Sequence, residues 1–236
     1  MAASASSITK VQQLYVAYYG RAGDPAGVDF WAGELDANGG NVSEMINQFG
    51  NSDEYTNGIG TGSITEQVTS LYQQMFNRAP ETAGLDFWVS EISSGKRTLG
   101  EVAVAIAESA LSDDATTLAN KVTVAEYFTG QISATGANYV AANIAEAQAI
   151  IASVSSDSAT ISSASSNSDS YMTNNASEVI FTLTSTGSQP ELINYSEHDN
   201  LIPENPYSEE VVELISIIGQ VDLADGNGDI DTSFYS

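Results

Sequence analysis

The residues best suited to hold a metal ion lie near the end of the 236-residue chain. They are Asp225, Asn227, Asp229 and Asp231. In a tight turn, alternate side chains can direct oxygens toward one hard cation, as at the start of an EF-hand loop. The sequence departs from that loop because Ile230 replaces the required Gly and Ser236 replaces the bidentate Glu. We expect calcium at this cluster; the alternative is a Gly- and Asp-rich turn without metal.

Two of the three arginines occupy equivalent places in the chain, because Arg21 and Arg78 each follow an apolar helical pattern. A guanidinium can donate two parallel hydrogen bonds to one carboxylate and so tie a turn to a helix. We expect a structural role, with acceptors in the helix that follows each arginine. The candidate acceptors are Asp29 and Glu34 for Arg21, and Asp86 and Glu91 for Arg78. The alternative is a ligand site present in both copies.

Other residue types that carry chemistry are few. His198 is the only histidine, and neither a nucleophile elbow nor a phosphate-binding glycine loop accompanies it. Trp31 and Trp88 lie on apolar stripes, which indicates core positions, with sugar stacking as the alternative. Carboxylate pairs for glycoside hydrolysis are uninformative in so acidic a chain. We therefore expect a protein that is not an enzyme.

The arginines and tryptophans belong to a repeat with a constant offset of 57 residues, residues 8–56 and 65–113. Each copy predicts three helices. In the first helix of each copy, apolar residues fall at i, i+3, i+4, i+7 and i+8. These residues are Val11, Leu14, Tyr15, Tyr18 and Tyr19 in the first copy, and Val68, Leu71, Tyr72, Met75 and Phe76 in the second.

Capping residues predict where the other helices begin. Asp24 followed by Pro25 predicts the start of the second helix in copy one, whereas copy two has a different sequence there. Asn41 with Glu44, and Thr98 with Glu101, predict a capping box at the third helix of each copy.

This pattern resembles a bacterial domain of unknown function. The resemblance rests on the Leu-Tyr helix, the Arg after it, and Gly-(Val/Leu)-Asp-Phe-Trp followed by Glu, and it covers roughly the first half of the chain. The family occurs in RTX-type proteins, S-layer proteins and other surface proteins secreted without an N-terminal signal peptide. It is distantly similar to the phycobilisome linker domain. The resemblance implies secretion and surface assembly, and it brings no catalytic residues.

Charge restricts the partners. The chain has 31 acidic and six basic residues, a formal charge of −25, and no cysteine. Nucleic acid and anionic membranes are bound by Lys and Arg, so we expect neither as a direct partner. The N-terminus has no Sec signal pattern and no stretch is apolar enough to span a membrane. The resemblance therefore favours an extracellular or cell-surface location reached by type I secretion.

Beyond the repeats, Thr116–Phe128 and Ala137–Ala152 predict two more helices. Ser, Asn and Asp dominate residues 153–176, which predicts a linker. The predicted fold class is mainly α: a helical domain over residues 1–152 and a smaller mixed α/β region over residues 177–236. In that region Ser177–Thr184 predicts a strand, and residues 208–219 a helix. Because the chain offers few other strands, we expect this strand to pair with a neighbouring subunit.

These features together predict a non-enzymatic, secreted structural protein. We expect it to assemble with itself into an S-layer-like lattice or a filament, with the help of calcium. The alternative is an attachment module that binds surface glycan or lipopolysaccharide.

Overall fold

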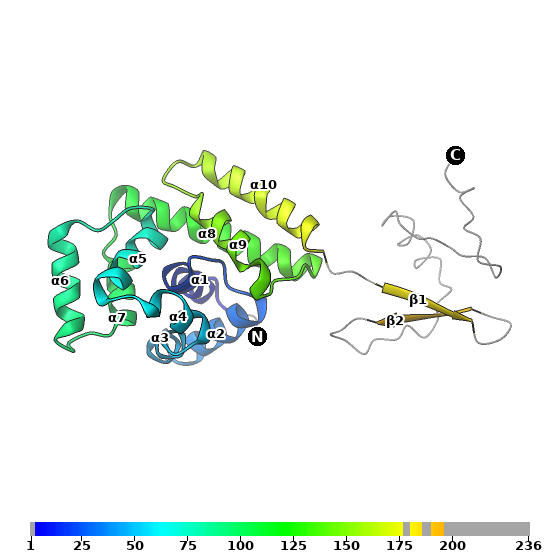
Figure 1. Ribbon diagram of the computed structural model, residues 1–236, viewed down its shortest axis with the longest axis horizontal. Helices are drawn as coiled ribbons and strands as arrows, with labels where there is room; N and C mark the ends of the chain where they lie inside the picture. Colours follow the sequence, from blue (N-terminus) through cyan, green and yellow to red (C-terminus); the bar gives the residue numbers. More distant parts are fainter. Residues whose placement is uncertain (1–2, 177–179, 186–189, 196–236) are drawn as a thin grey trace. The chain divides into compact units, whose positions relative to one another are not determined.

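Figure 1 shows the computed structural model, which describes residues 3–176, 180–185 and 190–195. The chain divides into a helical unit, residues 1–177, and a second unit, residues 178–236. The helical unit contains α1 (Ala5–Tyr19), α2 (Pro25–Ala37), α3 (Ser43–Gly50), α4 (Asp53–Asn57), η1 (Ile59–Thr61), α5 (Ile64–Phe76), α6 (Thr82–Ser93), α7 (Leu99–Glu108), α8 (Ser112–Thr135), η2 (Ala141–Asn143), α9 (Ile144–Ala152) and α10 (Ala159–Asn174). The expected mainly α class is confirmed.

The repeat forms the three helices expected in each copy: α1 to α3 in the first and α5 to α7 in the second. Both first helices end in a left-handed residue, Gly20 at φ 65° and Asn77 at φ 60°. Gly adopts this conformation without steric cost and Asn tolerates it. In each copy of the repeat the backbone therefore turns sharply just before the arginine. The 57-residue offset therefore describes a repeat of structure as well as of sequence.

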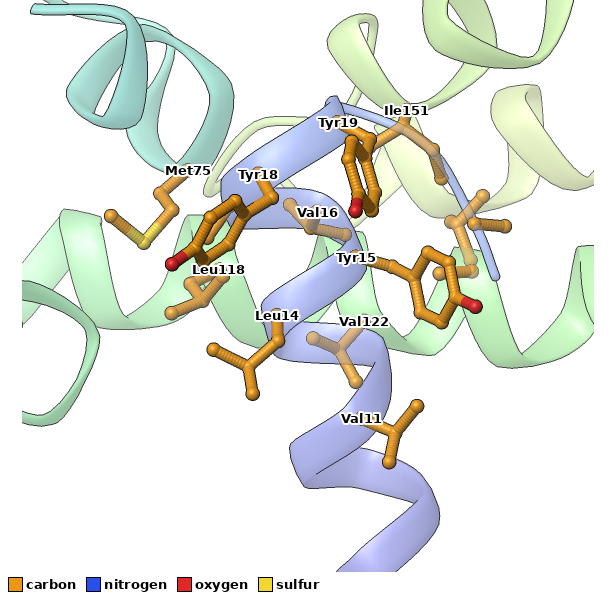
Figure 2. Packing of buried hydrophobic residues seen from close by; sticks show 14 of the residues in the cluster. Val11, Leu14, Tyr15, Val16, Tyr18, Tyr19, Met75, Leu118, Val122 and Ile151 are labelled. Atoms are coloured by element: carbon orange, nitrogen blue, oxygen red, sulfur yellow. The ribbon is translucent and has the colours of Figure 1, made fainter. Parts of the chain in front are cut away.

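Helix α1 lies at the centre of the core. Its side chains Leu14, Val16 and Tyr18 are buried, and Figure 2 shows them pointing in different directions toward surrounding helices. Met75 of α5, Leu118 of α8 and Ile151 of α9 surround α1 in the same view. The two repeats and the later helices therefore share one apolar core.

Two of the predicted helix starts are confirmed. Asp24 Oδ1 accepts from the Gly27 N–H at 2.7 Å and Pro25 follows it, while Thr98 and Glu101 form the expected capping box. The capping box predicted at Asn41 is wrong. Helix α3 begins at Ser43, whose N–H donates to Asn41 Oδ1, whereas Glu44 accepts from a glutamine one turn later. Val42 already has backbone angles close to helical, φ −86° and ψ −1°, and the Asn41 side chain accepts from the N–H two residues on instead of three.

The predicted bounds of the next two helices need correction. α8 is longer than expected and continues through Gly130 to Thr135, because it packs against several other helices, including α1 and α10. The second predicted helix begins at Ile144 instead of Ala137. Residues 137–140 have no regular secondary structure, and the partly buried Tyr139 packs against the core.

The linker predicted over residues 153–176 is wrong, because most of it is α10, which packs on α8 and α9. Its buried side chains are Ala164, Ser168, Tyr171 and Met172, spaced as one helical face. Small residues let α10 approach α8 closely, and the Ser168 hydroxyl donates to the carbonyl four residues earlier. The helical unit therefore extends beyond residue 152 to residue 177.

In the second unit, β1 (Ile180–Ser185) pairs antiparallel with β2 (Pro190–Tyr195). The strand predicted at Ser177–Thr184 overlaps β1, and its partner comes from the same chain. The sequence did not reveal β2, which pairs with one edge of β1; pairing of the other edge with a neighbouring subunit stays a prediction. The helix expected at 208–219, His198 and the acidic cluster at 225–231 lie outside the described residues.

Candidate functional site

Arg21 binds a carboxylate across the first repeat. Its Nε donates to Glu54 Oε1 at 2.7 Å and its Nη2 to Glu54 Oε2 at 2.6 Å, a parallel pair of bonds. The guanidinium carbon lies 5.2–5.4 Å from the ring centres of Tyr15, Tyr19 and Tyr139. The side chain is buried. Burial is the largest single effect and opposes its charge, but the hydrogen bond donated to Glu54 and the interactions with Tyr139 together outweigh burial and raise the pKa of Arg21.

Arg78 repeats this arrangement nearer the surface. It donates to both carboxylate oxygens of Asp114, at 2.8 and 2.6 Å, and lies over the ring of Tyr72 at 5.5 Å. Each arginine also donates from Nη1 to the carbonyl of the residue after it, Ala22 or Ala79. The Arg78 side chain is 41% exposed, against 9% for Arg21. The arginine, tyrosine and turn therefore repeat, while the degree of burial does not.

The acceptors predicted for the arginines are wrong. Asp29, Glu34, Asp86 and Glu91 do not bind Arg21 or Arg78 among the described contacts. The acceptors lie in the element after the third helix, where Ser52-Asp53-Glu54 corresponds to Ser112-Asp113-Asp114 at an offset of 60. A three-residue insertion therefore separates the copies here. A search that allowed this gap would have found both acceptors.

Lys121 was not singled out by the sequence. Its ammonium donates to the Gln74 carbonyl and to Asn77 Oδ1, both at 2.6 Å, at the end of α5. It is the one basic side chain without a carboxylate partner in the described part of the chain. Burial lowers the pKa of Lys121 to about 8. It donates to the Gln74 carbonyl, one of the carbonyls that a helix C-terminus leaves without an intrahelical donor.

The repeat also places the same three side chains on the outer surfaces of α2 and α6. Residues four or three apart are neighbours on a helix, so the Phe, Trp and Glu of each copy adjoin one another. The aromatic–acid face consists of Phe30, Trp31 and Glu34 on α2, and of Phe87, Trp88 and Glu91 on α6. Each Phe is more than half exposed, and the two rings in each face lie 4.9 and 4.7 Å apart. The core does not require these phenylalanines.

The two tryptophans are half-buried rather than enclosed. Trp31 touches the ring of Phe49 at 6.2 Å, and Trp88 donates from Nε1 to the Tyr72 hydroxyl at 3.2 Å. Each indole therefore packs inward along one edge. Each indole also lies close to the exposed phenylalanine that precedes it in the chain.

Helices α2 and α6 differ in how well they are covered. The inner stripe of α2, Val28, Ala32 and Leu35, is at most 3% exposed because α1 and α8 pack on it. None of the twelve described residues of α6 is buried. The residues equivalent to the α2 stripe are Leu85, Val89 and Ile92, and all three are half-buried. Figure 1 shows α6 at the edge of the helical unit, away from the α8 segment that covers α2.

The turn after α6 carries two of the six basic residues. Lys96 pairs with Glu91 at 3.0 Å and Arg97 with Glu91 at 3.6 Å, and the Arg97 guanidinium lies 6.0 Å from the ring centre of Trp88. Repeat one has Gly39 and Gly40 at these positions. Two basic side chains therefore lie beside the aromatic–acid face of α6, whereas the corresponding positions beside the face of α2 are glycines.

In the described part of the chain, no group of three or more His, Cys, Asp or Glu side chains is placed so that it could hold a metal ion. The predicted calcium ligands, Asp225, Asn227, Asp229 and Asp231, are outside that part. Among the described helices, none combines the length and the apolar character needed to cross a membrane.

Comparison with known proteins gives one match. A family model described as a domain of unknown function (DUF4214) matches residues 46–112, from within α3 to the start of α8. This segment contains the whole of the second repeat's three helices, in agreement with the resemblance stated from the sequence. No curated protein and no solved structure matches the chain.

Proposed function

We propose that this chain is a non-enzymatic structural protein that assembles with itself outside the cell, in a surface lattice or a filament. The observation that carries the proposal is the incomplete covering of α6. Leu85, Val89 and Ile92 are half-buried where their counterparts in α2 are enclosed. In repeat proteins each unit buries its apolar face against a neighbour, so a helix that is only partly covered is a place for another unit to pack.

The high negative charge adds a condition to this proposal. Chains of charge −25 repel one another, and that repulsion weakens when cations screen or bind the carboxylates. We propose calcium as the cation, held by Asp225, Asn227 and Asp229 with Asp231 assisting, because these oxygen ligands suit a hard ion. Type I secretion to the cell surface fits the family resemblance and is part of the same proposal.

Electron microscopy of purified protein, with calcium and with a chelator, tests the function. We expect extended polymers or ordered sheets with calcium, and fewer of them in chelator. Asp225→Ala with Asp229→Ala should make the two conditions alike, whereas Asp157→Ala, a single acid elsewhere, should not. Particles no larger than a single chain in all conditions would contradict self-assembly.

A second candidate function is attachment to surface glycan or lipopolysaccharide. The duplicated aromatic–acid face favours it, because an aromatic ring can cover the apolar side of a sugar while a carboxylate accepts from hydroxyls. Retention of the chain on polysaccharide, lost in Phe30→Ala with Phe87→Ala, would support attachment. Retention that is unchanged in this double variant would exclude these faces as the glycan site.

A further inference from the structure

The two aromatic–acid faces carry different local charge. Residues 25–42, which form α2 and the following turn, contain three acids and no base, a formal charge of −3. Residues 82–99, the same positions in repeat two, contain two acids and two bases, a formal charge of zero. The aromatic pair is common to both faces, so charge is what distinguishes them.

The exposed groups on the two faces complement each other. In the turn after α6, the side chains of Lys96 and Arg97 are 66% and 44% exposed although both pair with Glu91. On α2, Asp29 and Glu34 are exposed and have no ion pair among the described residues. Two bases share one carboxylate on α6, while two carboxylates on α2 lack a base. Contact between the faces would bring unlike charges together beside apolar rings.

We infer that the α6 face of one chain docks on the α2 face of a second copy of this chain. This inference rests on the self-association proposed above and adds its geometry. Phe30 of the second copy packs beside the exposed Phe87 of α6, and Lys96 and Arg97 reach Asp29 and Glu34 of the second copy. Burial of the apolar rings supplies the attraction, and the charges select which faces meet.

Charge also disfavours the symmetric alternatives. Two α2 faces in contact would place six carboxylates together with no base, whereas two α6 faces, each of formal charge zero, would leave the carboxylates of α2 without a base. A contact between unlike faces leaves each chain with one free face of each kind. Such head-to-tail contacts produce an open filament or, if the rotation closes, a ring.

Two variants of the full chain, each with one face disabled, test this geometry. The first is Lys96→Gln with Arg97→Gln, which disables the α6 face. The second is Phe30→Ala with Glu34→Gln, which disables the α2 face. Mass photometry and sedimentation velocity would be measured for wild type, for each variant alone and for an equimolar mixture. Lys10→Gln and Glu44→Gln remove a base and an acid on other helices and serve as matched controls.

We expect wild type and both controls to form polymers, and each face variant alone to associate at least roughly tenfold more weakly. The mixture should form one-to-one dimers and stop there, because only one intact face of each kind can meet. Circular dichroism melting curves close to wild type would show that the variants remain folded.

Three results would overturn the inference while leaving self-assembly in place. They are polymers as large as wild type from either variant, homodimers of the second variant through its intact α6 face, and a mixture that stays monomeric while wild type polymerises. A monomeric wild type would instead overturn the proposed function itself.

Discussion

Arg21 and Arg78 stabilise equivalent turns, but Arg21 is buried and Arg78 is partly exposed. Replacing each of them should therefore show how much burial of the ion pair adds to its effect on stability. Lys keeps the charge but loses the planar group that binds both oxygens of one carboxylate. We expect Arg21→Lys to lower the free energy of unfolding by about 2–3 kcal/mol, since three tyrosines enclose the guanidinium. Arg78→Lys should cost about 1 kcal/mol or less, because its ion pair is partly exposed.

Urea denaturation of both variants at neutral pH measures this difference, with Arg97→Lys as a surface control. Equal losses for Arg21→Lys and Arg78→Lys would contradict the account of burial. Unchanged midpoints in both, combined with lost binding to a surface component, would restore the ligand-site alternative for this pair.

Lys121 gives the molecule a distinct response to alkaline pH. Burial lowers its pKa to about 8 in the folded chain, against an ordinary value of 10.5. Between these values the unfolded chain binds more protons, so the free energy of unfolding should rise with pH. We expect a rise of roughly 1–2 kcal/mol from pH 7.5 to 9.5 relative to Lys121→Met.

Guanidinium denaturation of wild type and Lys121→Met at both pH values measures the effect. Buried tyrosines such as Tyr19 and Tyr139, whose pKa values are raised to about 12, change the stability only near and above pH 10. Both proteins contain these tyrosines, so the comparison removes their contribution. The same change of stability with pH in both proteins would show that Lys121 is not the group responsible.

At the level of helices, sequence reasoning succeeded mainly where the signal lies within one helix and its cap. The stripes of α1 and α5, the Asp24 cap and the Thr98 capping box followed from residue spacing alone. The arginine acceptors did not, because a three-residue insertion shifts Asp114 relative to Glu54. Packing of one helix against another depends on distant residues, so the uncovered state of α6 has no local signal either.

Helix α10 was missed for a different physical reason. Its composition is that of a linker, but its polar residues are mostly serines that can donate to the helix's own carbonyls. A buried Ser168 therefore costs little, and Tyr171 supplies the large apolar contact. The Tyr171 ring packs at 4.8 Å on Phe128 and its hydroxyl donates to the Asn138 carbonyl at 3.0 Å. If every Ser is assumed to be exposed, the apolar face of α10 that includes Ser168 cannot be recognised in the sequence.

Removal of the Tyr171 ring should therefore destabilise the helical unit. We expect Tyr171→Ala to lower the free energy of unfolding by about 3–5 kcal/mol, as for other large buried aromatic residues. Ser170→Ala, its exposed neighbour, should change the value by less than about 0.5 kcal/mol. Thermal and urea denaturation measure both. A Tyr171→Ala protein as stable as Ser170→Ala would show that α10 does not pack as described.

At the scale of the whole molecule, the helical unit ends at residue 177 instead of the predicted residue 152, so a truncated chain must include α10 to stay folded. A cut at residue 153 would remove α10 and expose Phe128 and Tyr139, whereas a cut after residue 177 follows the boundary of the helical unit. Both aromatic–acid faces lie before this boundary. We expect residues 1–177 to remain helical and to self-associate, measured by circular dichroism and light scattering. A folded fragment that stays monomeric would place the contacts in residues 178–236.

Charge acts on the molecule as a whole as well. At low ionic strength the repulsion between chains of charge −25 extends about 30 Å, and it shortens to about 8 Å near 0.15 M salt. Assembly through two faces must overcome this repulsion. Association should therefore strengthen as monovalent salt rises over this range, and strengthen further with calcium at constant ionic strength.

Self-assembly is the central claim, and sedimentation of the full chain over a wide range of concentration tests it most directly. The measurement would be made at 0.15 M salt with and without calcium. We predict a weight-average mass that rises continuously with concentration, and at lower concentrations when calcium is present. A mass that stays at the value of one chain at every concentration, in both conditions, would contradict the account.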